Sequence, residues 1–393
     1  MQFQPVTAKL PLALLTCFVV SQLMGAQNPR SVRFKTLYSF TDFGSPVAGL
    51  IQDAAGNLYG TTANGGAYNS GSVFKLDRTG TLKVLYSFAG GDDGGYPQSS
   101  LVLDSAGNLY GTTPYEGSGS CAGGIGCGVV FRVDVTGAET VLHTFTGTDG
   151  IYPFAGLIRD SEGNLYGTTQ YGGASGGGTV YKLDKDGKET VLYNFLSGSD
   201  GGQPLAGLVR DNDGNLYGTT STGGAPSCNC GTVFKLDAGG NETVLLGFTG
   251  AEGESPEANL ILDNKGNLYG TAYGGGAYGF GTVFRLDKRG REIVYSFTGG
   301  AGGIGPHSAL VRDQSGNVYG TTQLGGVYGH GIIFVVTPSG KEVVLHSFQD
   351  LPDGSMPEAG LIPCAASTLC GTTEFGGRYG TGTVFAVTIN CVC

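Results

Sequence analysis

Apolar and polar residues alternate in short runs along most of this chain, and the runs recur in a regular order. Each unit contains four apolar stretches, as in "AGLIRD" from Ala155, "NLYGTT" from Asn164, "GTVYKLD" from Gly178 and "ETVLYNF" from Glu189. Val, Leu, Tyr, Phe and Thr dominate these stretches, which is typical of β-strands. No segment after residue 30 shows helical periodicity. We therefore expect an all-β fold with four strands in every unit.

The units recur with a period of about 50 residues. The motif "GNLYGTT", or a near copy of it, places a glycine at seven positions, namely Gly60, Gly111, Gly167, Gly218, Gly270, Gly320 and Gly371. Seven repeats of four strands each are typical of the blades of a β-propeller. We therefore predict a seven-bladed β-propeller with four antiparallel strands per blade. The "AGL" strands are expected to line the axis and the "LYSF" strands to lie outermost.

The two ends of the repeat region complement each other. An "LYSF" strand, "RFKTLYSF" from Arg33, precedes the first "AGL", whereas the last repeat ends at "GTVFAVT" from Gly382 and lacks this strand. The N-terminal strand can therefore close the last blade and leave no open sheet edge. The expected propeller covers residues 31–390 as a single domain, with blades at about 48–88, 99–145, 155–195, 206–248, 258–297, 308–348 and 359–390 plus 31–40.

Short and long connections alternate between the strands. The turns "RDSEGN" and "LDKDGK" contain the Asp and Gly residues that tight hairpins favour. The other two connections of each unit are longer and follow "GTT" and "LYSF". All tight turns should therefore lie on one face of the disc and all long loops on the other. Long loops on a rigid scaffold are where binding residues usually lie.

Residues 1–26 differ from the repeats that follow. Lys9 precedes an apolar run from Leu10 to Ala26, a pattern typical of a secretory signal peptide. The run is short for a membrane span, and no later segment is apolar enough to cross a bilayer. We therefore expect a secreted or extracellular protein, with a bacterial cell surface as the alternative location, and a monomeric mature chain without a transmembrane segment.

Glycine and charge narrow the range of functions. The 74 glycines recur at fixed offsets beside aromatic and β-branched residues, which indicates turns between packed strands. The formal net charge is −10, and the charged residues are scattered along the chain. Nucleic-acid binding requires a basic face that replaces phosphate counterions. The sequence therefore argues against a nucleic-acid partner.

The repeat motifs resemble those of a known family. The patterns "D-x-x-G-N-L-Y-G-T-T", a Gly-Gly loop, "G-T-V-F-K-L" and "T-V-L-Y-S-F" recur from Arg33 to Thr388. They resemble the Gloeo/Verruco (GloVer) tandem repeat of exported bacterial proteins, and the hairpin also resembles, more weakly, the blades of NHL-type propellers. The resemblance implies an extracellular or cell-surface location. It implies no catalytic residue.

Nine cysteines occur in the chain, and eight follow the predicted signal peptide. An even number suits an oxidising compartment. We expect two disulfides, Cys121–Cys127 in a short insertion and Cys364–Cys370 at the Asp and Tyr positions of one hairpin. Closure within a Cys-x-Cys pair would be strained, and metal binding is the alternative. The pairing therefore stays open for Cys228, Cys230, Cys391 and Cys393.

Two sets of acidic residues recur once per blade. An aspartate in the first hairpin is expected to cap backbone N–H groups of its turn, at Asp53, Asp104, Asp160, Asp211, Asp263 and Asp313. A second set lies four residues before the proline that leads into each blade. It could bind Ca²⁺ together with loop carbonyls, or serve only its own turns; it comprises Asp42, Asp93, Asp149, Asp200, Glu252 and Asp353.

Residues that vary where their neighbours repeat are the best candidates for binding. Directly after these prolines, near the expected top of the axis, the chain places Phe154, Glu257, His307 and Glu358. After the "GTT" motif it places Gln170, Tyr171, Tyr273, Gln323 and Glu374. Tyrosines among polar groups suit sugars or protein partners. The alternative is that these side chains only pack within their loops.

No catalytic motif occurs in the chain. Gly-x-Ser-x-Gly, a Walker loop and His-Glu-x-x-His are all missing from the sequence, so no catalytic residue is assigned. The sequence favours an exported, non-catalytic propeller that binds a glycan or protein through its long-loop face. The alternatives are an extracellular hydrolase or lyase that uses carboxylates of that face, and a purely structural surface component.

Overall fold

The computed structural model describes residues 31–42, 44–119, 121, 124–287 and 290–390. The predicted signal peptide, residues 1–26, lies outside these ranges, as do Cys391 and Cys393. Within them, no helix is long and apolar enough to cross a membrane. The helical segments of this part are two 3₁₀ turns, η2 (Gly91–Asp93) and η3 (Gly300–Gly302).

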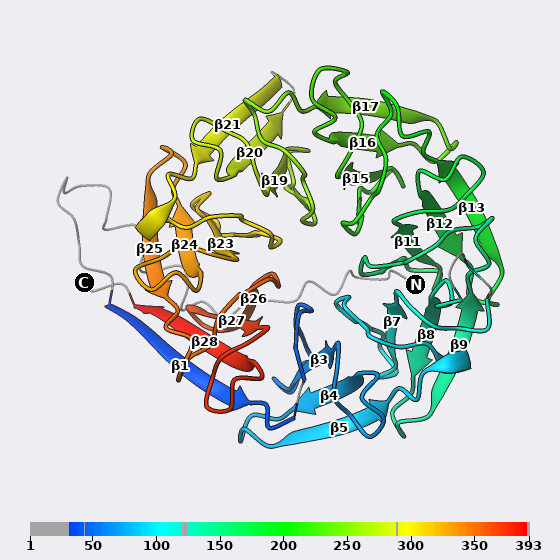
Figure 1. The fold of residues 1–393 in the computed structure, drawn as a ribbon, viewed down its shortest axis with the longest axis horizontal. Coiled ribbons are helices and arrows are strands. Elements are labelled where there is room, and N and C mark those ends of the chain that lie inside the picture. Colours follow the sequence, from blue (N-terminus) through cyan, green and yellow to red (C-terminus); the bar gives the residue numbers. More distant parts are fainter. Residues whose placement is uncertain (1–30, 43, 120, 122–123, 288–289, 391–393) are drawn as a thin grey trace, which may run out of the picture.

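Seven four-stranded antiparallel sheets surround one axis, as the sequence predicts (Figure 1). From the axis outward, blade 1 contains β2 (Ile51–Gln52), β3 (Leu58–Thr62), β4 (Ser72–Leu76) and β5 (Leu82–Ser87); blade 2 contains β6 (Val102–Leu103), β7 (Leu109–Thr113), β8 (Val129–Val133) and β9 (Glu139–Thr144); blade 3 contains β10 (Ile158–Arg159), β11 (Leu165–Thr169), β12 (Thr179–Leu183) and β13 (Glu189–Asn194). Blade 4 contains β14 (Val209–Arg210), β15 (Leu216–Thr220), β16 (Thr232–Leu236) and β17 (Glu242–Gly247); blade 5 contains β18 (Ile261–Leu262), β19 (Leu268–Ala272), β20 (Thr282–Asp287) and β21 (Gly290–Ser296). Blade 6 contains β22 (Val311–Arg312), β23 (Val318–Thr322), β24 (Ile332–Val336) and β25 (Glu342–Ser347).

Blade 7 combines the two ends of the repeat region. Its sheet has the order β1-β28-β27-β26, with β1 (Ser31–Ser39) outside β28 (Thr383–Asn390), β27 (Thr368–Thr373) and β26 (Ile362–Ala365). The β1–β28 register runs from Ser31 opposite Asn390 to Ser39 opposite Thr383. The predicted closure by the N-terminal strand is therefore confirmed.

The innermost strands are shorter than the apolar stretches suggest. In blade 3 the strand covers only Ile158–Arg159, although the stretch begins at Ala155. Backbones of neighbouring blades approach each other closely at the axis, since a Cβ atom on Gly207 would lie 2.9 Å from the carbonyl oxygen of Gly156. The "AGL" residues therefore border the axis as irregular chain, and pairing begins only after them.

Packing between blades explains the repeated "LYGTT" motif. Gly60 lies opposite Phe74 in the neighbouring strand, and a Cβ atom there would lie 2.7 Å from the Phe74 ring. The first threonine binds the next blade, as Thr168 Oγ1 donates to the Ala206 carbonyl oxygen at 3.0 Å. Glycine and threonine at these positions are therefore requirements of the fold.

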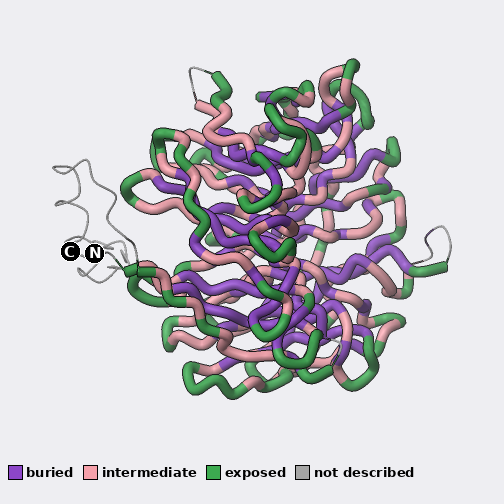
Figure 2. The backbone as a smooth tube through the Cα atoms, turned by 60° about the vertical axis from the view of Figure 1, so that its left-hand side comes forward, coloured by how far each residue is buried: buried purple, intermediate pink, exposed green. Residues whose placement is uncertain are grey.

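The hydrophobic core lies between neighbouring sheets, and one buried cluster combines side chains of blades 1 and 2. Figure 2 shows the buried residues, in purple, in the interior of the molecule. A phenylalanine directly after each outer strand packs edge-to-face on the third strand of the next blade, as Phe88 does on Phe131 with centroids 5.0 Å apart. Phe40 packs in the same way on Phe74, at 5.4 Å, and so joins blade 7 to blade 1. Such pairs contribute about 0.5–1.5 kcal/mol each beyond area burial. The ring is therefore stabilised by one repeated contact.

The hairpin at the start of each blade has the expected aspartate turn, with one substitution. In blade 1, Asp53 Oδ1 accepts the backbone N–H of Asn57 and Asp53 Oδ2 accepts the Tyr59 hydroxyl, at 2.9 and 3.0 Å. In blade 7 the same two positions hold Cys364 and Cys370, which form a disulfide. A covalent bond therefore replaces the Asp–Tyr hydrogen bond there.

Two more disulfides occur among the described residues. Cys121–Cys127 forms as predicted. Cys228–Cys230 is also bonded, although we expected strain to oppose this closure. Asn229 between them adopts a left-handed conformation with φ of 56°, and the bend brings the two Cα atoms to 5.1 Å, within the usual range. The structure therefore pairs two cysteines whose pairing the sequence left open.

Candidate functional site

A cavity of about 450 Å³ lies at the axis of the propeller. All seven residues that directly follow the prolines leading into the blades line it: Val47, Gln98, Phe154, Leu205, Glu257, His307 and Glu358. Each lies in the long loop between the outer strand of one blade and the inner strand of the next. The fold therefore brings one variable residue from every blade to a single cavity.

The charged residues of this cavity come from consecutive blades. Glu257, His307 and Glu358 precede the inner strands of blades 5, 6 and 7. His307 Nε2 lies 3.0 Å from Glu257 Oε2, and 33% of the histidine side chain is exposed. The residues from blades 3 and 4 are Phe154 and Leu205. The cavity therefore has a charged arc on one side and apolar side chains on the other.

A second row of polar residues lies behind the charged arc. The Tyr273 hydroxyl donates to Gln323 Oε1 at 2.9 Å, and Gln323 Nε2 donates to Glu358 Oε1 at 2.5 Å. Glu374 is in hydrogen-bonding contact with Glu358. Tyr273, Gln323 and Glu374 each follow the second strand of their blade, so each reaches inward beside the inner loops. The result is a hydrogen-bonded chain that extends over three blades.

The carboxylates of this site raise the pKa of His307 and of Glu374. Although burial opposes the cation, the hydrogen bond and charge of Glu257 and the charge of Glu358 raise the pKa of His307. Burial, then the charge and hydrogen bond of Glu358, raise the pKa of Glu374 to about 7. The charge of the adjacent Glu358 disfavours ionisation of Glu374, so Glu374 can carry a proton near neutral pH. The site can accept hydrogen bonds from hydroxyl groups and can also hold a proton.

The remaining candidates lie around the same cavity. Gln170 lines it, whereas Tyr171 is exposed and its hydroxyl donates to Gln203 at 3.2 Å. Sequence reasoning missed Asn259, which lines the cavity and accepts the Gly207 N–H at 2.6 Å. The signal was present, because Asn259 occupies the position that holds only Gly, Ser or Ala in the other "AGL" segments.

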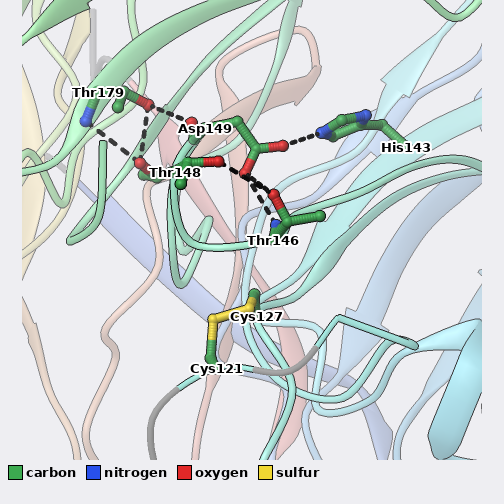
Figure 3. A network of polar contacts seen from close by, with 8 residues as sticks. Cys121, Cys127, His143, Thr146, Thr148, Asp149 and Thr179 are labelled. Carbon is green, nitrogen blue, oxygen red and sulfur yellow. Dashed lines mark hydrogen bonds and ion pairs between the residues drawn. A yellow bond between two sulfur atoms is a disulfide. The ribbon is translucent and has the colours of Figure 1, made fainter. Parts of the chain in front are cut away.

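The carboxylates proposed for calcium hold their own loops. Asp149 accepts hydrogen bonds from His143 Nε2 and from the backbone N–H of Thr146, at 2.9 and 2.8 Å (Figure 3). Asp93 accepts the Tyr86 hydroxyl at 2.7 Å in the same way. In the described part of the chain, one group of side chains is close enough to share a metal ion, namely Cys228, Cys230 and Glu254; it contains none of these acids, and its two cysteines are joined in a disulfide. Calcium binding stays a prediction.

Comparisons with known proteins identify the repeats and the fold. A sequence model of the Gloeobacter/Verrucomicrobia repeat matches residues 26–228, 119–314 and 196–385. A search of curated proteins found no match. Among solved structures, the extracellular domain of a provisionally assigned one-component system from B. thetaiotaomicron is similar, with a TM-score of 0.55, 14% identity, and coverage of 92% of this chain and 43% of that one.

A provisionally assigned 6-phosphogluconolactonase from Bacteroides uniformis ATCC 8492 is also similar, with a TM-score of 0.51, 19% identity, and coverage of 80% of this chain and 88% of that one. A gluconolactonase from Xanthomonas campestris has a TM-score of 0.42 and 16% identity, with coverage of 67% and 79%. At these identities the likeness shows a propeller fold and no shared chemistry.

Proposed function

Because this chain belongs to the Gloeobacter/Verrucomicrobia repeat family, we propose that it is an exported, non-catalytic β-propeller that binds a glycan in its axial cavity. One observation carries the proposal: the variable residues of all seven blades converge on this cavity, with a charged arc facing apolar side chains. The ring brings these positions together, but it does not require them to be variable or charged, because packing is already provided by the repeated residues. Convergent polar groups in an otherwise apolar pocket are typical of ligand sites.

The chemistry of the lining favours a small, neutral, polyhydroxylated ligand. A volume of about 450 Å³ suits a short saccharide and is too small for a protein surface. Glu257 and Glu358 can accept hydrogen bonds from hydroxyl groups, and Phe154 offers an aromatic surface to the apolar side of a sugar ring. The described lining contains no lysine or arginine, and its histidine, His307, is already paired with Glu257, so a phosphate or uronate would face carboxylates without a free cation.

Location outside the cytoplasm is part of the proposal. Three disulfides among the described residues support an oxidising compartment. The apolar run up to Ala26 supports export. β1 of the same chain completes blade 7, so no second chain is needed to supply its outer strand. We therefore propose a secreted or surface-exposed monomer.

Titration calorimetry with a panel of neutral mono- and oligosaccharides, with and without Ca²⁺, tests this function. Phe154→Ala and Glu257→Gln should each weaken binding of the best ligand about tenfold or more, which corresponds to about 1.4 kcal/mol. The matched control is Lys185→Ala with Lys188→Ala, on the exposed β12–β13 turn. Loss of binding in the control alone would overturn the proposal, as would a panel in which nothing binds.

A second function, acid–base hydrolysis, is favoured by the carboxyl pair. Glu374 with a pKa of about 7 beside Glu358 suits proton donation to a leaving group. The test is product release from neutral sugar lactones and glycosides by the wild type and by Glu374→Gln. Hydrolysis that Glu374→Gln abolishes, while calorimetry still detects ligand, would establish an enzyme. Binding without turnover would support the non-catalytic function.

A further inference from the structure

A second surface of the long-loop face carries exposed tyrosines. In blades 1, 5, 6 and 7 the loop between the second and third strands has the pattern G-G-x-Y-x-x-G, over residues 65–71, 275–281, 325–331 and 376–382. The tyrosine at each tip is exposed, to 65%, 59%, 54% and 52% for Tyr68, Tyr278, Tyr328 and Tyr379 respectively. Blade 7 adjoins blade 1, so these blades are consecutive around the ring (Figure 1). We refer to the four residues as the tyrosine arc.

The loop tips that present the tyrosine arc are held in one repeated geometry. The backbone N–H of the residue before each tyrosine donates to the hydroxyl of the serine that ends the outer strand of the same blade. In blade 1, Ala67 N–H donates to Ser87 Oγ at 3.2 Å, and in blade 7 Arg378 N–H donates to Ser39 Oγ at 3.3 Å. The hydroxyl oxygens of Ser296 and Ser347 accept the corresponding hydrogen bonds in blades 5 and 6. The tips are therefore pre-organised, which lowers the entropic cost of binding.

The fold does not require a tyrosine at these tips. In blade 3 the loop is anchored in the same way, by Ala174 N–H to Asn194 Oδ1 at 2.8 Å, yet its tip residue is Ser175. In blade 2 the loop holds the Cys121–Cys127 insertion, and in blade 4 the Cys228–Cys230 pair. Because the same turn forms with serine, packing does not explain four largely exposed aromatic rings.

We propose that the tyrosine arc binds a neutral polysaccharide chain, with sugar rings packed against successive tyrosines. Each tyrosine lies at the tip of a loop on its own blade, so the arc offers one aromatic platform per blade, and Phe280 and Val327 are also exposed beside Tyr278 and Tyr328. A stable protein interface needs about 800 Å² per partner around a packed apolar centre, whereas these tyrosines are carried on four separate loops. A polymer with repeating rings can contact several platforms at once.

The charge of the arc argues against a single-stranded nucleic acid, the other kind of polymer whose rings stack on aromatic side chains. Single-stranded nucleic acids need a positively charged groove beside the stacking residues. Among the 28 positions of the four G-G-x-Y-x-x-G segments, the only lysine or arginine is Arg378, which lies over the Tyr379 ring at 5.5 Å. The arc is separate from the axial cavity, since none of its tyrosines lines that cavity.

Affinity electrophoresis through gels containing neutral β-glucan, xylan, mannan or galactan tests the proposal. The wild type should be retarded by at least one polymer, and affinity for its oligosaccharides should rise with chain length, as multivalent contact requires. The double variant Tyr278→Ala/Tyr328→Ala should bind about tenfold more weakly, and the quadruple variant should migrate as in an empty gel. Val135→Ala, an exposed apolar residue on a tight turn, is the matched control.

Two results would overturn the inference: no retardation of the wild type by any polymer, or equal retardation of the quadruple variant. Because exposed residues are replaced, thermal melting should show an unchanged fold. Calorimetry with short sugars reports the axial cavity separately. The tyrosine-arc variants should leave that signal unchanged, so failure of either site can be recognised on its own.

Discussion

Blade 3 contains a buried hydroxyl group that the other blades lack. At the centre of the third strand six blades have phenylalanine, whereas β12 has Tyr181. Its ring packs on Phe145 with centroids 5.0 Å apart, as the equivalent phenylalanines do. The side chain is fully buried, and no described residue provides a hydrogen-bond partner for its hydroxyl. Tyr181→Phe removes this hydroxyl and keeps the ring.

The expected gain in stability follows from removing a hydroxyl group that folding withdraws from water without providing a hydrogen-bond partner. A buried polar group without a partner costs about 1–3 kcal/mol. The substitution also loses a few oxygen contacts, each about 0.1–0.2 kcal/mol. We therefore expect Tyr181→Phe to raise the free energy of unfolding by about 1 kcal/mol. In a chain of this length the melting temperature should rise by roughly 1–3 °C.

Urea denaturation followed by intrinsic tyrosine fluorescence measures the change, with reversibility checked first. If refolding fails, unfolding rates at fixed temperature replace the equilibrium comparison. Phe234→Tyr at the equivalent position of blade 4 is the reciprocal control and should destabilise by about 1–3 kcal/mol. A Tyr181→Phe variant destabilised by more than about 0.5 kcal/mol would refute the reasoning, because its hydroxyl would then have a stabilising partner.

Two further predictions concern the ring and its charges. Deleting residues 31–40 removes β1 and the Phe40–Phe74 contact. The deletion should lower the melting temperature and cause self-association through the exposed edge of β28. An unchanged melting curve together with a monomeric elution volume in size-exclusion chromatography would contradict the closure. Burial and the charge of Asp93 raise the pKa of Glu139 to about 7, and burial and Asp200 do the same for Glu242. Folding raises both pKa values, so their stabilising contribution is fully present below pH 4.5 and is lost as the pH rises through about 7. Because solvent screens these partly exposed sites, each residue should lose about 1 kcal/mol of its contribution to the free energy of unfolding. The difference in the free energy of unfolding between the wild type and Glu139→Gln/Glu242→Gln, followed across pH 4–8, measures this loss. Parallel curves of stability against pH would contradict the assignment.

The order of elements follows from local patterns in the sequence. Strand stretches, tight turns and the seven glycines from Gly60 to Gly371 each depend on residues close together in the chain, so their period predicts blade number and strand order. The unmatched strand at Arg33 likewise predicts closure, because the last repeat lacks the outer strand that every other repeat contains. Cys364 and Cys370 could be paired because they replace residues that face each other in every other hairpin.

Contacts between blades depend on the three-dimensional structure. The positions after the prolines were predicted to lie near the axis, but the chain from Tyr273 through Gln323 to Glu358 joins residues 50 and 35 positions apart and has no sequence pattern. The raised pKa of Glu374 depends on that chain. The two-residue inner strands of blades 1 to 6 also follow from crowding at the axis. Strand and turn preferences act over a few residues, whereas a site at the centre of a ring is created only when all seven blades meet.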